Sequence, residues 1–278
     1  DLNYRLDGDR GNPYKVEVPT GDVYGVVEHG DQPYVYATIP GNNALVVVNT
    51  NTDSISKSIN IGSQPRGLTI KPDSSKVFVA LNGESAIKVV NTSTNAVVDT
   101  FNVTYTPEEI VYGGPGRLYV SDGTHIHVLD PGDGSEASTL PYHAYAGDLL
   151  AMSPDGETLC SGSPGISPAS IACYDISTDS PPSPWTKFDI GGNLRTMDVS
   201  ADGDVLYTAC GAPYHIKALN INTLSQVGQF DTGAYPQSAY DSHLGDMVYI
   251  SGGDSSWSWD PGTYSPLRIL DHEEVVFL

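Results

Sequence analysis

The sequence of Lys71–Phe101 is KPDSSKVFVALNGESAIKVVNTSTNAVVDTF, and Ser200–Phe230, SADGDVLYTACGAPYHIKALNINTLSQVGQF, repeats its pattern. Each stretch has a polar turn, an apolar segment, a polar loop, a second apolar segment that closes on Asn-x-x-Thr, and a third segment. Alternating and β-branched residues within these segments are typical of β-strands. The pattern therefore predicts units of short antiparallel strands joined by turns.

The same unit recurs along most of the chain. The apolar marker of its first long strand recurs at spacings of 42, 41, 41, 47 and 42 residues, at Val35, Val77, Leu118, Leu159, Leu206 and Val248. Periods of ~40–50 residues, with about four short strands each, are typical of a β-propeller in which each repeat forms one blade. We therefore predict an all-β fold in which residues 1–278 form a single β-propeller domain.

Both ends of the chain continue the pattern beyond these six repeats. Asp7 lies 42 residues before Asn49, which closes the third strand of the first full repeat. Asn3–Asp7 and Tyr14–Val18 are therefore expected to share a blade with Glu274–Leu278, which would close the ring and remove sheet edges. The expected fold has seven blades of four antiparallel strands with one blade shared by the termini. A six-blade ring with extra terminal strands is the alternative.

Several segments resemble the YVTN-type β-propeller repeat family, which is found in surface-layer and secreted proteins. The matching segments are Gly62–Pro65 (GSQP), Pro72–Ala80 (PDSSKVFVA), Ile87–Thr94 (IKVVNTST) and Ser153–Leu159 (SPDGETL). The YVTN tetrapeptide itself is replaced by Phe78-Val-Ala-Leu81. The resemblance implies a secreted or cell-surface protein.

The charge of the chain excludes one class of partner. Thirteen basic residues face 34 acidic ones, for a formal net charge of −21. Nucleic-acid binding depends on Lys and Arg neutralising phosphates, so we expect no nucleic-acid partner. No apolar run approaches the ~18 residues that a membrane helix needs, so we expect no membrane insertion. We expect a monomer.

The three cysteines and two glycosylation sequons bear on the compartment. Cys160 and Cys173 occupy the positions of Phe78 and Val89 in the Lys71 repeat, where they are expected to be cross-strand neighbours. They form either a disulfide, which implies an oxidising compartment, or a pair of small buried hydrophobes. Cys210 has no evident partner. Asn91-Thr-Ser and Asn102-Val-Thr are sequons compatible with secretion.

In propellers of the resembling kind, the loops between blades and the loops after each second strand share one face around the channel. Arginine can hold a carboxylate or enolate, and Tyr, His and Glu can carry protons. The candidate catalytic residues are Tyr235, His215 and Glu108, and the candidate ligand-binding residues are Arg66, Arg195, Asn82, Asp122, His125, Tyr145 and Trp257. The alternative is a ring of polar residues and salt bridges that hydrates a blind channel.

We expect no metal and no cofactor. His125-Ile-His127 could place two imidazoles on one strand face. However, His127 aligns with Lys88 and Lys217, which are expected to be solvent-exposed. No Cys-x-x-Cys, His-Glu-x-x-His or phosphate-loop motif occurs.

These observations lead to two hypotheses of different class. The first is a secreted propeller that binds a small organic or carbohydrate ligand at its channel mouth, with metal-independent lyase, isomerase or cyclase activity as an extension. The second is a non-catalytic cell-surface or adhesion module. Activity by analogy with other propellers rests on the fold alone.

Overall fold

The computed structural model describes residues 22–141, 143, 147–180, 183–231, 236, 238–241, 247–251, 267–271 and 276–277. Within these residues the regular elements are β-strands and one short 3-10 turn, Pro40–Asn42. Every recorded strand pairing is antiparallel, so the predicted all-β class is confirmed. The described part of the chain contains no helix with the length and apolar character that a membrane crossing requires.

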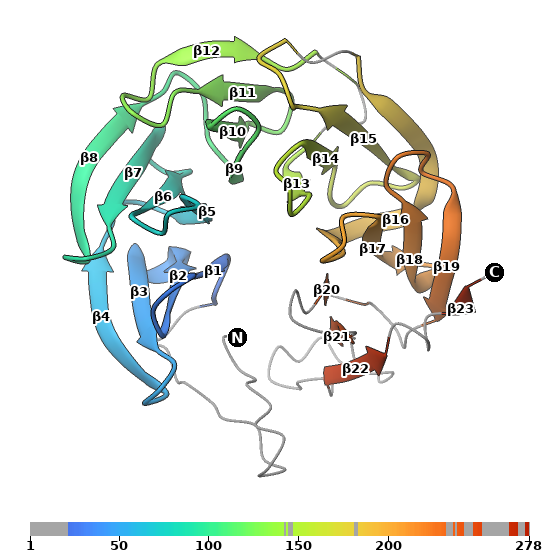
Figure 1. The fold of residues 1–278 in the computed structure, drawn as a ribbon, viewed down its shortest axis with the longest axis horizontal. Helices are drawn as coiled ribbons and strands as arrows, with labels where there is room; N and C mark the ends of the chain where they lie inside the picture. The colour runs from blue at the N-terminus through green and yellow to red at the C-terminus, as the bar shows by residue number, and fades with distance from the viewer. Residues whose placement is uncertain are drawn as a thin grey trace. The chain divides into compact units, whose positions relative to one another are not determined.

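The chain divides into two compact units, and the prediction of a single domain stays a prediction. The first unit holds three sheets of four strands each, joined in chain order (Figure 1). Their strands are β1 (Val26–Glu28), β2 (Tyr34–Ile39), β3 (Ala44–Asn49), β4 (Ser54–Asn60), β5 (Pro65–Ile70), β6 (Lys76–Leu81), β7 (Ala86–Asn91), β8 (Ala96–Asn102), β9 (Ile110–Gly113), β10 (Arg117–Ser121), β11 (Ile126–Leu129) and β12 (Glu136–Thr139). The short stretches Gly113–Pro115 and Gly123–Ile126 are counted with the second unit.

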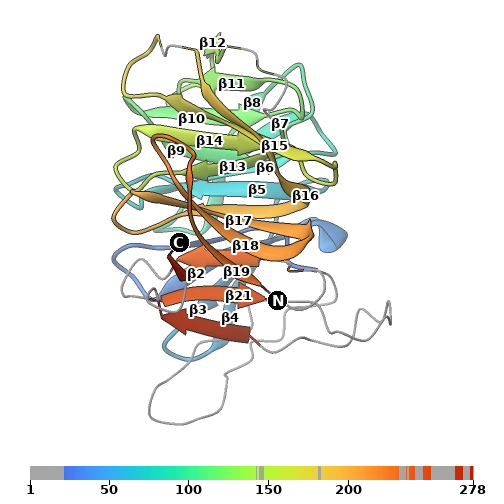
Figure 2. The ribbon, with the colours of Figure 1, turned by 90° about the vertical axis from the view of Figure 1, so that its right-hand side faces the viewer.

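The second unit holds the remaining strands, and Figure 2 shows β16, β17, β18 and β19 side by side within it. Its strands are β13 (Leu149–Met152), β14 (Thr158–Gly162), β15 (Ala169–Asp175), β16 (Trp185–Val199), β17 (Val205–Ala212), β18 (Tyr214–Asn220), β19 (Gln226–Asp231), β20 (Ser238–Asp241), β21 (Met247–Ser251), β22 (Leu267–Asp271) and β23 (Val276–Phe277). Strand β16 pairs with β15 along its first half and with β17 along its second half, so it belongs to two repeats.

The repeat pattern of the sequence is confirmed by the positions of its markers. All six lie on the second strand of their repeat, namely on β2, β6, β10, β14, β17 and β21. Five of them are fully buried, whereas Val35 is half-buried. The 42-residue period therefore corresponds to one four-stranded unit for most repeats.

Alternation along β6 explains how neighbouring sheets of the first unit pack. Val77 and Val79 join an apolar cluster with Tyr36 of β2. Phe78 lies on the opposite face and joins a cluster with Leu118 of β10. Successive side chains of a strand point to opposite faces, so this sheet is buried on both sides. Each such large apolar side chain contributes about 1.5–3 kcal/mol through burial.

Asn82 and Gly83 lie in the connection between β6 and β7, which is longer than a two-residue turn. Leu81 pairs with Ala86, which leaves four residues in the connection, and Ser85 adopts the left-handed φ of 49°. Gly83 has another function: a Cβ there would lie 2.4 Å from Ser63 Oγ. The glycine is needed for the close approach of two loops.

The C-terminal strand differs from its prediction. Val276 and Phe277 pair with Gln229 and Gly228 of β19, so this segment extends the β16–β19 sheet. It satisfies the backbone groups of an edge strand that would otherwise be unpaired. Asn3–Asp7 and Tyr14–Val18 lie outside the described residues.

Candidate functional site

Three of the ten candidate residues meet in the first unit. Arg66 is the second residue of β5, Asn82 begins the β6–β7 turn, and Glu108 lies just before β9. Arg66 Nη1 forms an ion pair with Glu108 Oε2, and Asn82 Nδ2 donates a hydrogen bond of 2.6 Å to Glu108 Oε1. Both carboxylate oxygens of Glu108 therefore have partners within the protein.

The backbone holds these side chains in place. Gly67 N donates to Glu108 O at 3.0 Å, which ties β5 to the segment before β9. A Cβ on Gly67 would lie 2.6 Å from Glu109 Cα, so only glycine permits this approach. Thr38, which is fully buried, donates from Oγ1 to Arg66 O at 2.7 Å and so ties β2 to β5.

Tyr24 completes this group, although the sequence pattern did not single it out. The Arg66 guanidinium carbon lies 5.6 Å from the centroid of the Tyr24 ring, a cation–π geometry. Burial and the neighbouring Glu109, which accepts a hydrogen bond from Tyr24, raise the pKa of the Tyr24 hydroxyl well above its ordinary value. Solvent reaches 43% of the Tyr24 surface, so this shift carries little stability.

We call Tyr24, Arg66, Asn82, Glu108 and Glu109 the Arg66 cluster. Its members come from all three sheets of the first unit: the segment before β1, β5 with its β6–β7 turn, and the segment before β9. Arg66 keeps 33% of its side chain exposed and Glu108 keeps 17%. The arrangement is a network of internal pairs at a junction of sheets.

Asp122 is also paired within the protein. His127 Nε2 lies 3.2 Å from Asp122 Oδ2, and His127 Nδ1 lies 3.1 Å from Glu136 Oε1. The Tyr105 ring stacks on the imidazole, with centroids 3.6 Å apart and planes 6° apart. His127 is mostly buried, with 12% of its side chain accessible, although it aligns with Lys88 and Lys217, for which solvent exposure was expected.

The metal hypothesis receives no support from the described residues. Within them, no group of three or more His, Cys, Asp or Glu residues is arranged to hold a metal ion. His125 is exposed on the turn before β11, while both ring nitrogens of His127 face carboxylates.

His215 lies in a strand and not in a loop, contrary to the prediction. Gly211 pairs with Tyr214, which shortens the β17–β18 connection to two residues and draws His215 into β18. Its side chain is 2% exposed, and its Nε2 lies 3.4 Å from Ile190 O. Its cross-strand partner Cys210 donates from Sγ to the same carbonyl at 3.4 Å. Burial raises the pKa of the Cys210 thiol to about 11.

The remaining candidates divide into two groups. Arg195 lies in the second unit, where it is exposed at a bulge of β16 between Leu194 and Thr196. Tyr145, Tyr235 and Trp257 lie outside the described residues. Their convergence with the Arg66 cluster therefore stays a prediction.

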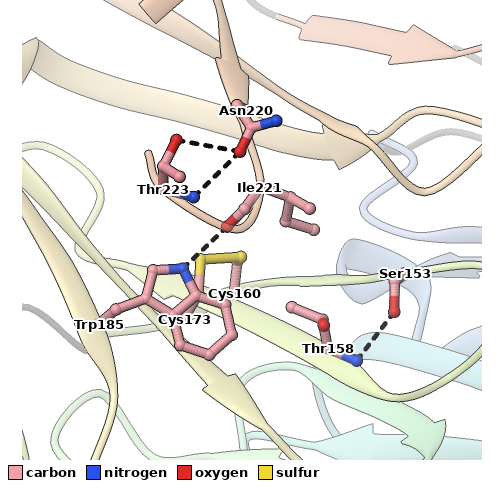
Figure 3. Close-up of a disulfide and its surroundings, with 8 residues drawn as sticks. All are labelled: Ser153, Thr158, Cys160, Cys173, Trp185, Asn220, Ile221 and Thr223. Carbon is pink, nitrogen blue, oxygen red and sulfur yellow. Dashed lines mark hydrogen bonds between the residues drawn. A yellow bond between two sulfur atoms is a disulfide. The ribbon is translucent and has the colours of Figure 1, made fainter. Parts of the chain in front are cut away.

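Cys160 and Cys173 form a disulfide between β14 and β15 (Figure 3). Their Cα atoms are 4.0 Å apart, closer than the ~5.5 Å typical of disulfides, because the two residues are direct register partners. Figure 3 shows the Trp185 indole beside the bond, with its Nε1 donating to Ile221 O at 2.8 Å. The predicted cross-strand pairing of the two cysteines is therefore confirmed, and of the two alternatives the structure shows the disulfide.

Comparison with known proteins identifies the fold and no family. Neither a scan against protein-family models nor a search of curated proteins finds a match. Among solved structures 1509 chains match, which indicates a widely used fold that implies no particular activity. One of them, titled Kuenenia stuttgartiensis hydrazine synthase, is similar over 96% of this chain and 99% of its own, with a TM-score of 0.63 and 14% identity. At that identity, the likeness shows that the two chains share a fold and nothing further.

Proposed function

We propose that this protein is a secreted or cell-surface β-propeller that serves as a non-catalytic interaction module. The observation that carries the proposal is the internal pairing of Glu108 with Arg66 and Asn82. A carboxylate that already accepts from Arg66 and Asn82 is less available to take a proton from a substrate, and the donors that it holds are less available to a ligand. Both oxygens of Glu108 are already in use, so the Arg66 cluster is better suited to joining sheets than to chemistry.

The proposed location rests on the Cys160–Cys173 disulfide. Structural disulfides form and persist in oxidising compartments and are rare in the cytosol. The proposed architecture is a ring of YVTN-type repeats, and because Val276–Phe277 pairs with β19 the proposal does not include a blade shared by the termini. The six repeat markers on second strands support the repeat assignment.

A second candidate function is ligand binding at the Arg66 cluster, with or without metal-independent lyase, isomerase or cyclase activity. The observation that favours it is the exposed third of Arg66 beside the Tyr24 ring. A guanidinium next to an aromatic ring suits an anionic sugar such as a uronate, because the charge and the ring face bind different parts of it.

Thermal unfolding with a panel of sugars, uronates and lactones separates the two candidates. A ligand at 100 times its Kd stabilises a folded protein by about 2.7 kcal/mol. The ligand-site candidate requires such a shift in the wild type and its loss in Arg66→Ala. The interaction-module proposal expects no shift with any compound, together with a lower Tm for Arg66→Ala in buffer alone.

The matched control is Arg117→Ala. Arg117 belongs to the same unit and pairs with Asp130 through a longer contact of 3.4 Å, and Asp130 is 46% exposed. We expect a smaller loss of Tm in this variant than in Arg66→Ala. A ligand-dependent shift that Arg66→Ala removes and Arg117→Ala retains would contradict the proposal.

A further inference from the structure

We infer that Asn102 is an N-glycosylation site of this protein and that Asn91 is not. The inference rests on the proposed secretion, because oligosaccharide transfer to asparagine occurs in the secretory pathway. Both residues begin sequons, so the sequence alone does not distinguish them.

The side chain of Asn91 has a structural function that accounts for its sequence. Its Oδ1 accepts hydrogen bonds from Thr94 N at 3.0 Å and Thr94 Oγ1 at 3.1 Å, which closes the β7–β8 turn. Asn220 makes the same two bonds to Thr223 after β18, each at 3.0 Å. Asn49 Oδ1 caps the β3–β4 turn with a related pair of bonds, which it accepts from Asn51 N at 2.9 Å and Thr52 N at 3.3 Å. Neither Asn49 nor Asn220 begins a sequon, so the asparagine is a feature of the repeat turn.

Asn102 has no such function among the described residues. It is the last residue of β8, it is exposed, and its side chain makes no hydrogen bond within the described part of the chain. The backbone beside it is fixed, because Val103 N donates to Ser85 O at 3.0 Å. Its sequon partner Thr104 is also exposed. The carboxamide therefore projects from a rigid strand end with room for a bulky substituent.

The transfer can be written in full for this site. The donor is an oligosaccharide linked to a lipid diphosphate. The bond between the anomeric carbon and the phosphate oxygen breaks, and a bond from that carbon to Asn102 Nδ2 forms. Nδ2 loses one proton to a base, and the lipid diphosphate leaves with the electron pair of the broken bond.

The modification would protect an exposed sheet edge. Strand β8 ends the order β5-β6-β7-β8, so one side of its backbone is unpaired within that sheet. Val97 and Val98 on this strand are 39% and 54% exposed. Edge strands with exposed apolar residues invite pairing with other chains, and a glycan on the same strand blocks it.

The test uses the full chain secreted from a yeast host behind the host's own leader. Two matched substitutions, Thr104→Ala and Ser93→Ala, each remove the hydroxyl of one sequon and leave both asparagines intact. Peptide mapping after enzymatic deglycosylation, which converts a glycosylated asparagine to aspartate, locates the glycan. We expect modification of Asn102 in the wild type and in Ser93→Ala, and none in Thr104→Ala.

A glycan at Asn91, or an unmodified Asn102 in the secreted wild type, would overturn the inference. The host leader makes this result independent of the native location. Secretion itself is tested separately by the oxidation state of Cys160 and Cys173 in protein from its natural source. Free thiols there would count against secretion and leave the choice between the two sites untouched.

Discussion

The disulfide between Cys160 and Cys173 offers the clearest test of stability. We expect the double substitution Cys160→Ala with Cys173→Ala to lower the free energy of unfolding by about 3 kcal/mol, because a bond across a sequence separation of 13 residues restricts the unfolded chain by about that amount. Unfolding entropy scales with length, at ~2.1 cal/mol/K per residue. For a chain of 278 residues, this loss corresponds to a fall in Tm of about 5 °C.

The assay is thermal unfolding followed by circular dichroism, with and without a reductant that reaches the buried bond during unfolding. The wild type should lose Tm on reduction, and the double variant should not respond. Cys210→Ala is the control, since Cys210 is a free buried thiol and its removal should leave the response to reductant intact. Equal Tm values for oxidised and reduced wild type would refute this reasoning.

Three further predictions concern single buried groups. Tyr105→Phe should change the free energy of unfolding by less than about 0.5 kcal/mol. The buried Tyr105 hydroxyl has no hydrogen-bond partner within the described residues, and the ring that stacks on His127 is retained. In urea unfolding, a loss as large as that of Tyr105→Ala would contradict this. Thr38→Val should lower the free energy of unfolding by about 1–3 kcal/mol in the same assay, because Arg66 O and Gly25 N then lose their hydrogen bonds with Thr38 Oγ1. An unchanged urea midpoint would show that these bonds do not stabilise the fold. Burial raises the pKa of the Cys210 thiol from 9.0 to about 11, so the folded state favours the protonated thiol. Its contribution to the free energy of unfolding should be fully present below pH 9 and should be lost as the pH rises through 11. Cys210→Ala should therefore flatten the decline of stability over that range, and native Cys210 should resist alkylation at pH 8; rapid labelling there would contradict the burial.

The parts of the fold that the sequence predicted are those set by local patterns. Period-two alternation and turn residues located the second strand of each repeat, and alignment of Cys160 and Cys173 with Phe78 and Val89 gave their register. These signals are local because each strand's side chains alternate between two buried faces.

The parts that the sequence did not predict depend on packing between segments far apart in the chain. Tyr24 joins the Arg66 cluster because its backbone N–H donates a hydrogen bond of 3.0 Å to Thr38 O, which fixes Tyr24 beside β2. The sequence pattern places His215 in a loop because it precedes the Ile216–Asn220 strand segment, whereas strand pairing extends as far as Tyr214. The burial of His127 involves the Tyr105 ring, which comes from the connection between β8 and β9 and stacks on the imidazole.

The central claim is that Arg66 and Glu108 stabilise one another and are not held ready for a ligand. A double-mutant cycle with Arg66→Ala, Glu108→Gln and the combined variant measures this coupling by urea unfolding. The ion pair is partly exposed, with Glu108 accepting from Arg66 and Asn82 together. We expect a coupling of about 1–2 kcal/mol, below the upper range for hydrogen bonds to charged groups because solvent screens Arg66. A coupling within about 0.3 kcal/mol of zero would contradict the claim, since the pair would then contribute nothing to the fold.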